Sequence, residues 1–289
     1  ITTDAVGLSA STGFKFISVT NPVTGNNYSG LEATGITAAI AGLPDKISIS
    51  LDGGLVAYNK SVSSHKIDWT TATVTNDPDD LLADLDISSD IDFRIFGTAN
   101  LTVGTFIENL AVTIGIEKGQ DDFVLSNGVT SSQSITGVDY LKFYGAIVNP
   151  LLVGYDGTGL ELSDLKIGMI SVQHANSKYT AFKASGSADL KGLPLIKVSG
   201  SAALISNKST DPAGKVLDFV NTSSNVTDDS AANVIIDNYD GDAATNVSLD
   251  LDGDKGDLLR INGYDLVLDL AGFVVISGDL VFEKQSTPR

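Results

Sequence analysis

Hydrophobic and polar residues alternate along several stretches of the chain. One stretch covers residues 182–190 and continues, after the turn sequence Gly-Leu-Pro, at 196–204; two others cover 47–57 and 266–270. A period of two residues predicts β-strands with one buried and one solvated face. Helix-like stretches are short, at 78–85 and 140–148 at most, so the sequence predicts an all-β fold.

Small residues occupy many positions on the predicted inward side of 182–204. These positions are Ala184, Gly186, Ala188, Gly200 and Ala202. Because they leave little side-chain volume, strands or sheets must approach closely there, which favours a thin, elongated β-structure. We expect a β-solenoid or an extended sheet, and two tandem β-sandwiches are the alternative.

The two halves of the chain contain similar segments in the same order. The matching pairs are 16–19 with 169–172, 28–35 with 179–186, 54–60 with 202–208, 67–69 with 217–219, 84–97 with 250–263 and 116–118 with 282–284. Preserved order indicates that one β-unit is used twice. We predict a first copy at 1–120, a connecting segment at 121–158 that contains the turn sequence GYDGTG, and a second copy at 159–289.

Composition narrows the possible partners. The net charge is −18, and hydrophobic residues make up 42% of the chain, so a folded core is expected. The acidic balance argues against nucleic acid and anionic membrane surfaces as partners, because both attract positive charge. No apolar run is long enough to span a membrane as a helix. The chain has no Cys, which excludes disulfides and thiolate metal sites.

Clusters of aspartates interleaved with Gly predict calcium sites. The predicted ligands are Asp237, Asp240, Asp242, Asp250, Asp252, Asp254 and Asp257 in the second copy, and Asp84 and Asp86 in the first. Ca²⁺ requires several oxygen ligands on a flexible backbone, and it would relieve the repulsion among the carboxylates. The EF-hand pattern is not met, because Lys255 stands where that loop requires Gly. The alternative is a solvated acidic loop.

Catalysis is not expected from this sequence. The acidic pairs Asp84/Asp86 and Asp250/Asp252 share a strand face, a geometry that glycosidases use. Sugar-binding platforms are usually aromatic, however, and Trp69 is the only Trp; Phe219 takes its place in the second copy, which indicates a core position. We therefore predict that the protein is not an enzyme.

The second half resembles repeat domains of very large secreted or surface-attached bacterial proteins, which often combine such repeats with calcium-dependent, adhesin-like regions. The segments that carry the resemblance are 157–172, 179–207, 216–219 and 256–284, and the first half follows them more loosely. The resemblance implies an extracellular, cell-surface role as a structural or adhesive module, for example in a filament. Its partners would be neighbouring repeats or further copies of itself. A carbohydrate- or ligand-binding module that recognises surface glycans through Tyr239 and Tyr264 is the alternative.

Overall fold

The structure, a computed structural model, is almost entirely β, with 71% strand and 4% helix. It describes residues 7–39, 47–63, 65–76, 84–103, 107–219, 234–237, 239 and 243–286. The predicted all-β class is confirmed. Residues 140–147 of the helix-like stretch 140–148 are part of a strand, and 140–146 pair with β8 without a register shift.

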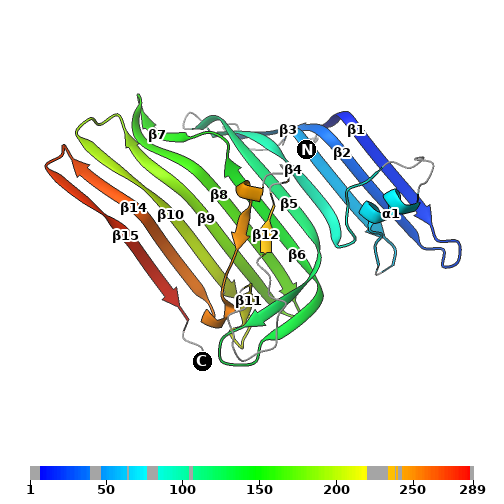
Figure 1. Cartoon of the computed structure of the whole chain (residues 1–289). Coiled ribbons are helices and arrows are strands. Elements are labelled where there is room, and N and C mark those ends of the chain that lie inside the picture. The colour runs from blue at the N-terminus through cyan, green and yellow to red at the C-terminus, as the bar shows by residue number, and fades with distance from the viewer. Residues whose placement is uncertain are drawn as a thin grey trace, which may run out of the picture. The chain divides into compact units, whose positions relative to one another are not determined.

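Thirteen strands form one antiparallel sheet, and two short strands form a second (Figure 1). The main sheet has the order β1-β2-β3-β4-β5-β6-β8-β9-β10-β14-β15, with β7 paired to β8 and β11 to β5. The strands are β1 Gly7–Thr20, β2 Asn27–Ala39, β3 Ile47–Ser61, β4 Ile91–Val103, β5 Ile107–Ser126, β6 Gln133–Ile147, β7 Leu151–Tyr155, β8 Thr158–His174, β9 Ser177–Lys191, β10 Ile196–Ser209, β11 Val216–Asp218, β12 Val234–Ile236, β13 Val247–Leu249, β14 Leu258–Leu270 and β15 Val274–Gln285. The helices are α1 Trp69–Asn76 and the 3-10 turns η1 Ala243–Thr245 and η2 Gly253–Lys255. Of the arrangements considered above, the extended sheet is the one present.

The chain forms two compact units, residues 1–121 and 122–289. Strand β5 runs through the boundary and contributes its last residues to the second unit. The segment 121–158, predicted to connect two copies, supplies β6 and β7 and lies almost wholly in the second unit. Its turn sequence closes the β7–β8 hairpin, with Asp156 and Gly157 at φ 51° and 73°, as a two-residue hairpin turn requires.

In the first unit, the segment between β3 and β4 covers one face of β1–β3. Trp69 at the start of α1, together with Leu85, Ile87 and Ile91, is buried against the sheet. The nearest sheet position is Gly30 on β2, where a Cβ would lie 2.8 Å from the Trp69 ring and 2.6 Å from Leu85. The bulk of Trp69 is therefore accommodated by the absence of a side chain below it.

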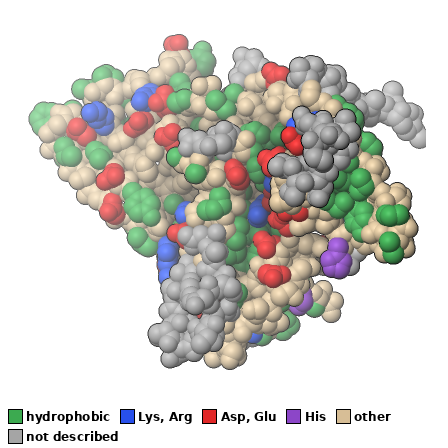
Figure 2. All heavy atoms as spheres, turned by 45° about the vertical axis from the view of Figure 1, so that its right-hand side comes forward, with side chains coloured by type: hydrophobic (Ala, Val, Ile, Leu, Met, Phe, Trp, Pro, Cys, Tyr) green, Lys and Arg blue, Asp and Glu red, His purple; other side chains and the backbone are tan. Residues whose placement is uncertain are grey.

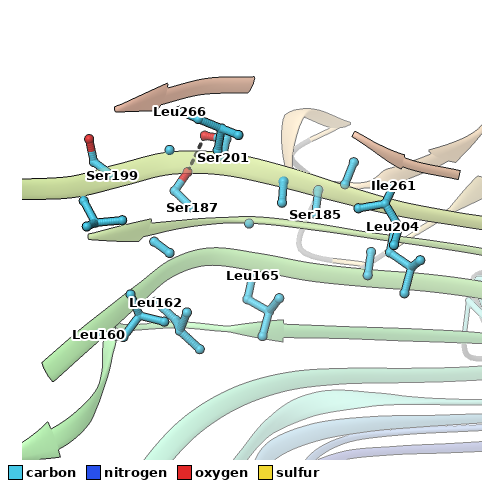
Figure 3. A pocket seen from close by; sticks show the side chains of 17 residues that line it. Leu160, Leu162, Leu165, Ser185, Ser187, Ser199, Ser201, Leu204, Ile261 and Leu266 are labelled. Atoms are coloured by element: carbon cyan, nitrogen blue, oxygen red, sulfur yellow. Dashed lines mark hydrogen bonds between the residues drawn. The ribbon is translucent and has the colours of Figure 1, made fainter. Parts of the chain in front are cut away.

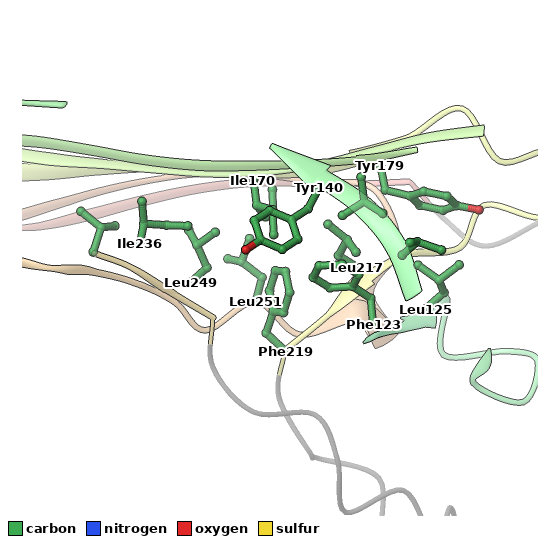
Figure 4. Packing of buried hydrophobic residues seen from close by; sticks show 14 of the residues in the cluster. Phe123, Leu125, Tyr140, Ile170, Tyr179, Leu217, Phe219, Ile236, Leu249 and Leu251 are labelled. Atoms are coloured by element: carbon green, nitrogen blue, oxygen red, sulfur yellow. The ribbon is translucent and has the colours of Figure 1, made fainter. Parts of the chain in front are cut away.

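In the second unit, the longer segment between β10 and β14 covers the sheet (Figure 4). It supplies Leu217, Phe219, Ile236, Leu249 and Leu251, which pack on sheet residues. The sheet residues beneath are Tyr140, Ile170, Val172, Tyr179, Ala181 and Ile205. Burying this many large apolar side chains is the main favourable contribution to folding here.

The buried side of β9 is the opposite of the predicted one. Tyr179 and Ala181 join the core, whereas Ala184 and Gly186 have the other parity and are only half-buried. Because β9 pairs with β10 without a register shift, residues of opposite parity lie on opposite faces of the sheet. The expectation that the small residues face the core is therefore wrong, because alternation alone does not tell which face of a strand is covered.

Matched positions in the two units make the same contacts. Nδ2 of Asn59 donates to the carbonyl of Ile67 at 2.9 Å, and Nδ2 of Asn207 donates to the carbonyl of Leu217 at 2.6 Å. A matched Arg–Glu pair also occurs in both halves of the chain. Arg94 pairs with Glu117 across β4 and β5, and Arg260 pairs with Glu283 across β14 and β15.

Candidate functional site

The acidic loop before β14 is held by contacts within the protein. Nζ of Lys183 lies 2.9 Å from Oδ1 of Asp250. Oδ1 of Asp252 accepts a hydrogen bond from the backbone N–H of Asp254 at 3.0 Å and caps η2. Oγ of Ser126 donates to Oδ1 of Asp254 at 2.5 Å. These three predicted calcium ligands therefore have a lysine, a turn amide and a serine hydroxyl as partners.

Two further predicted ligands of the second unit, Asp237 and Asp257, accept hydrogen bonds from backbone N–H groups. Oδ1 of Asp257 accepts from the N–H of Ser209 at 3.2 Å, and Oδ1 of Asp237 accepts from the N–H of Tyr239 at 2.7 Å. Asp240 and Asp242 lie outside the described residues.

In the first unit, Asp84 and Asp86 are exposed, and their main chain is fixed to β1 and β2. Nζ of Lys15 donates to the carbonyl of Asp84 at 2.8 Å. The N–H of Asp86 donates to Oε2 of Glu32 at 2.9 Å. The pair that resembled two catalytic carboxylates thus belongs to a loop held over the sheet.

Within the described residues, no three His, Asp or Glu side chains come together as a metal ion would require. On the face drawn in Figure 2, Asp and Glu side chains lie at several separate places as well as near the middle of the view. Calcium binding stays a prediction of the sequence.

Three side chains of the second unit have shifted pKa values. A hydrogen bond to Glu161 raises the pKa of Lys191, and burial, followed by the charge of Asp211, raises the pKa of Tyr179. The hydrogen bond from Arg260 lowers the pKa of Glu283. Each shift moves the group away from neutral pH, so none of the three is tuned as a general acid or base near pH 7.

Strand β15 is the most unusual feature of the second unit. All twelve of its residues are exposed, and within the described chain it pairs only with β14. Its apolar side chains lie on both faces: Ile276, Leu280 and Phe282 on one, Val275 and Val281 on the other. A long apolar edge strand with free backbone groups is a template for another strand.

A groove of about 500 Å³ lies in the second unit, over β8, β9, β10 and β14 (Figure 3). Ala184, Gly186, Ala188, Gly200 and Ala202, the small residues singled out in the sequence, line its floor. They lie on the face opposite Ala181 and the buried cluster.

Leucines from irregular points in the strands form the sides of this groove. Leu165 and Leu266 stand where the register shifts, between Ser163 and Lys166 and between Gly263 and Leu266. A Cβ at Gly200 would lie 2.7 Å from Cδ2 of Leu266, and one at Gly186 would lie 3.2 Å from Cα of Leu165. The glycines therefore admit leucines of the same sheet rather than a second sheet.

Sequence reasoning missed both β15 and the groove. A signal for the first was present: Val274, Val275 and Ile276 are consecutive apolar residues, which is typical of a strand covered on both faces. The groove depends on register shifts, which alternation does not reveal. Tyr264, one of the two aromatics proposed for glycan binding, is exposed, and its hydroxyl accepts a hydrogen bond from Nδ2 of Asn262 at 2.7 Å. Tyr239, the other, is half-buried.

Comparison with protein-family models, with curated protein sequences and with solved structures finds no match for this chain. None of the helices in the described part of the chain has the length and apolar character needed to cross a membrane.

Proposed function

We propose that the chain is two copies of one β-unit and acts as a structural or adhesive repeat module of an extracellular assembly. The module extends by adding a strand from a further copy to the edge of its sheet. The proposal assigns it no catalytic reaction. It is supported by the sequence matches, by the shared Asn and Arg–Glu contacts, and by the resemblance to repeats of large secreted bacterial proteins.

The observation that carries the proposal is the contrast between β5 and β15. The matched segments 116–118 and 282–284 place these two strands at corresponding positions. Strand β5 is followed in the sheet by β6, whereas β15 has no such neighbour among the described strands. By this correspondence, β15 is suited to receive an antiparallel strand as β5 does. That strand would pair with the backbone groups at the outer edge of β15 and would flank its exposed apolar side chains on each face.

The proposal is tested by analytical ultracentrifugation of the chain over rising protein concentration. We expect the average mass to increase with concentration. Ile276→Lys, at a position 60% exposed on β15, should return the protein to the monomer, because a charged edge side chain disfavours strand addition. Val129→Lys is the matched control: Val129 is 63% exposed in the β5–β6 turn, and the substitution changes the net charge equally.

A monomer at every concentration, or equal effects of the two lysines, would contradict edge addition. A monomer that binds surface glycans would favour the ligand-binding alternative instead. Circular dichroism melting of each variant shows whether the sheet itself is intact.

A further inference from the structure

The groove of the second unit offers few polar partners to a ligand. Its polar lining residues are serines, and in strands β9 and β10 they have the opposite parity to the Ala and Gly floor: Ser185, Ser187, Ser199 and Ser201. Its 17 lining residues include no charged side chain. The hydroxyls of Ser187 and Ser201 bond to each other at 2.8 Å, as the dashed line in Figure 3 shows. Each of β8, β9, β10 and β14 lies between two neighbouring strands, so most of its backbone groups are already paired. A polar group placed in this groove would lose its hydrogen bonds to water and gain few in return.

The size of the groove matches a small-molecule site. Its volume of about 500 Å³ falls within the roughly 300–1,000 Å³ typical of such sites. Leu160, Leu162 and Leu165 lie on one side of the floor, and Leu204, Ile261 and Leu266 lie on the other (Figure 3). The large side chains of the lining are all aliphatic, and none of its residues is aromatic.

We propose that this groove binds an unbranched aliphatic chain, such as the alkyl chain of a fatty acid or a lysolipid. Such a chain has no polar group along its length, so burying it costs no hydrogen bond, and each CH₂ removed from water favours binding. This inference does not depend on the edge addition at β15.

Two other occupants fit less well. A peptide segment would bury its own N–H and C=O groups against strands whose backbone is already paired. A second copy related by a two-fold axis would set one floor of Ala and Gly against another and leave the facing grooves unfilled, contrary to the close packing of protein interiors.

The test is displacement of an uncharged fluorescent probe, N-phenylnaphthylamine, from the full chain. We expect palmitate and palmitoyl lysophosphatidylcholine to displace the probe, and glycerophosphocholine, which has the same head group and no alkyl chain, to leave it bound. Displacement by both amphiphiles would assign recognition to the chain. Displacement by one alone would show that its head group contributes. Co-sedimentation with phosphatidylcholine vesicles would show whether the chain is taken from a bilayer.

Variants place the site in the groove. Ala202→Trp puts an indole on the exposed floor and should weaken binding about tenfold or more, because it fills much of a groove of about 500 Å³. Ala213→Trp, in the exposed turn after β10, is the matched control. Leu204→Glu is a second variant and should also abolish displacement, since it places a carboxylate in the wall.

Equal binding by Ala202→Trp and Ala213→Trp, in proteins with unchanged melting, would overturn the proposal. So would the absence of displacement by either amphiphile. A doubling of mass that Ala202→Trp abolishes, without any alkyl binding, would assign the groove to a second copy of the protein.

Discussion

Asn59 in the first unit and Asn207 in the second occupy matched positions, and their surroundings differ. Nδ2 of Asn59 donates to the carbonyls of Ile67 and Ser88 at 2.9 and 3.0 Å. Its Oδ1 accepts from Nε1 of Trp69 at 2.9 Å. Asn207 makes the corresponding bond to Leu217, but in the described structure its buried Oδ1 has no donor.

The aromatic residue explains this difference. Phe219 replaces Trp69 and has no N–H to donate. The ring is smaller in the second unit, and the residue matched to the position beneath it is larger: Gly30 in the first unit corresponds to Ala181 in the second. A larger ring over no side chain, or a smaller ring over a methyl group, fills the same place. The change in ring size is thus compensated by the residue beneath the ring. The loss of the indole N–H is not compensated, because Oδ1 of Asn207 has no donor in the described structure.

The largest expected effect comes from removing each asparagine. Asn59→Ala loses three hydrogen bonds and should lower the free energy of unfolding of the first unit by about 3 kcal/mol, at about 1 kcal/mol for each bond. Asn207→Ala loses one and should cost about 1 kcal/mol. Urea unfolding measures both, with Trp69 fluorescence reporting on the first unit. Equal costs would show that the additional bonds of Asn59, to Ser88 and from Trp69, do not stabilise that unit.

Filling the space under Trp69 should have a smaller effect. Gly30→Ala places a methyl group less than 3 Å from Trp69 and Leu85, and such overpacking costs about 1–3 kcal/mol. Adding Trp69→Phe reproduces the pair found in the second unit and should recover part of that loss in a double-mutant cycle. Gly278→Ala, at an open position on β15, is the control. Additive effects of Gly30→Ala and Trp69→Phe would contradict the compensation.

The smallest expected effect concerns the Arg260–Glu283 pair. Because the pKa of Glu283 is lowered in the folded protein, this carboxyl contributes stability at pH values above its unfolded pKa, and that contribution is lost as the pH falls through the lower, folded value. Glu283 is partly exposed, so solvent screening limits the contribution to about a few tenths of a kcal/mol. In Glu283→Gln, position 283 no longer titrates, so the decrease in stability below about pH 4 should be smaller by this amount. Identical acid-melting curves for the two proteins would contradict it.

Part of this architecture was predictable from local patterns. The alternation at 182–204 predicted strands, and GYDGTG predicted a turn, because both depend on residues close together in the chain. That turn was expected between the two copies, and it closes a hairpin within the second unit. Interpreting the exchange of Trp69 for Phe219 as a core substitution was also correct, since both are buried. The partners of the aspartates could not be predicted in the same way. Lys183 and Ser126, which contact Asp250 and Asp254, lie 67 and 128 positions away in the sequence.

The sequence by itself determined that this protein is built of β-strands and that its halves share an order of segments, because side-chain periodicity and turn residues act over a few positions. Only the tertiary structure decided which face of β9 is buried and which forms a groove. Both faces of that strand carry apolar residues, and the covering segment that distinguishes them comes from beyond β10. The register shifts that raise Leu165 and Leu266 over glycines were likewise settled by pairing between strands, which no single stretch of sequence contains.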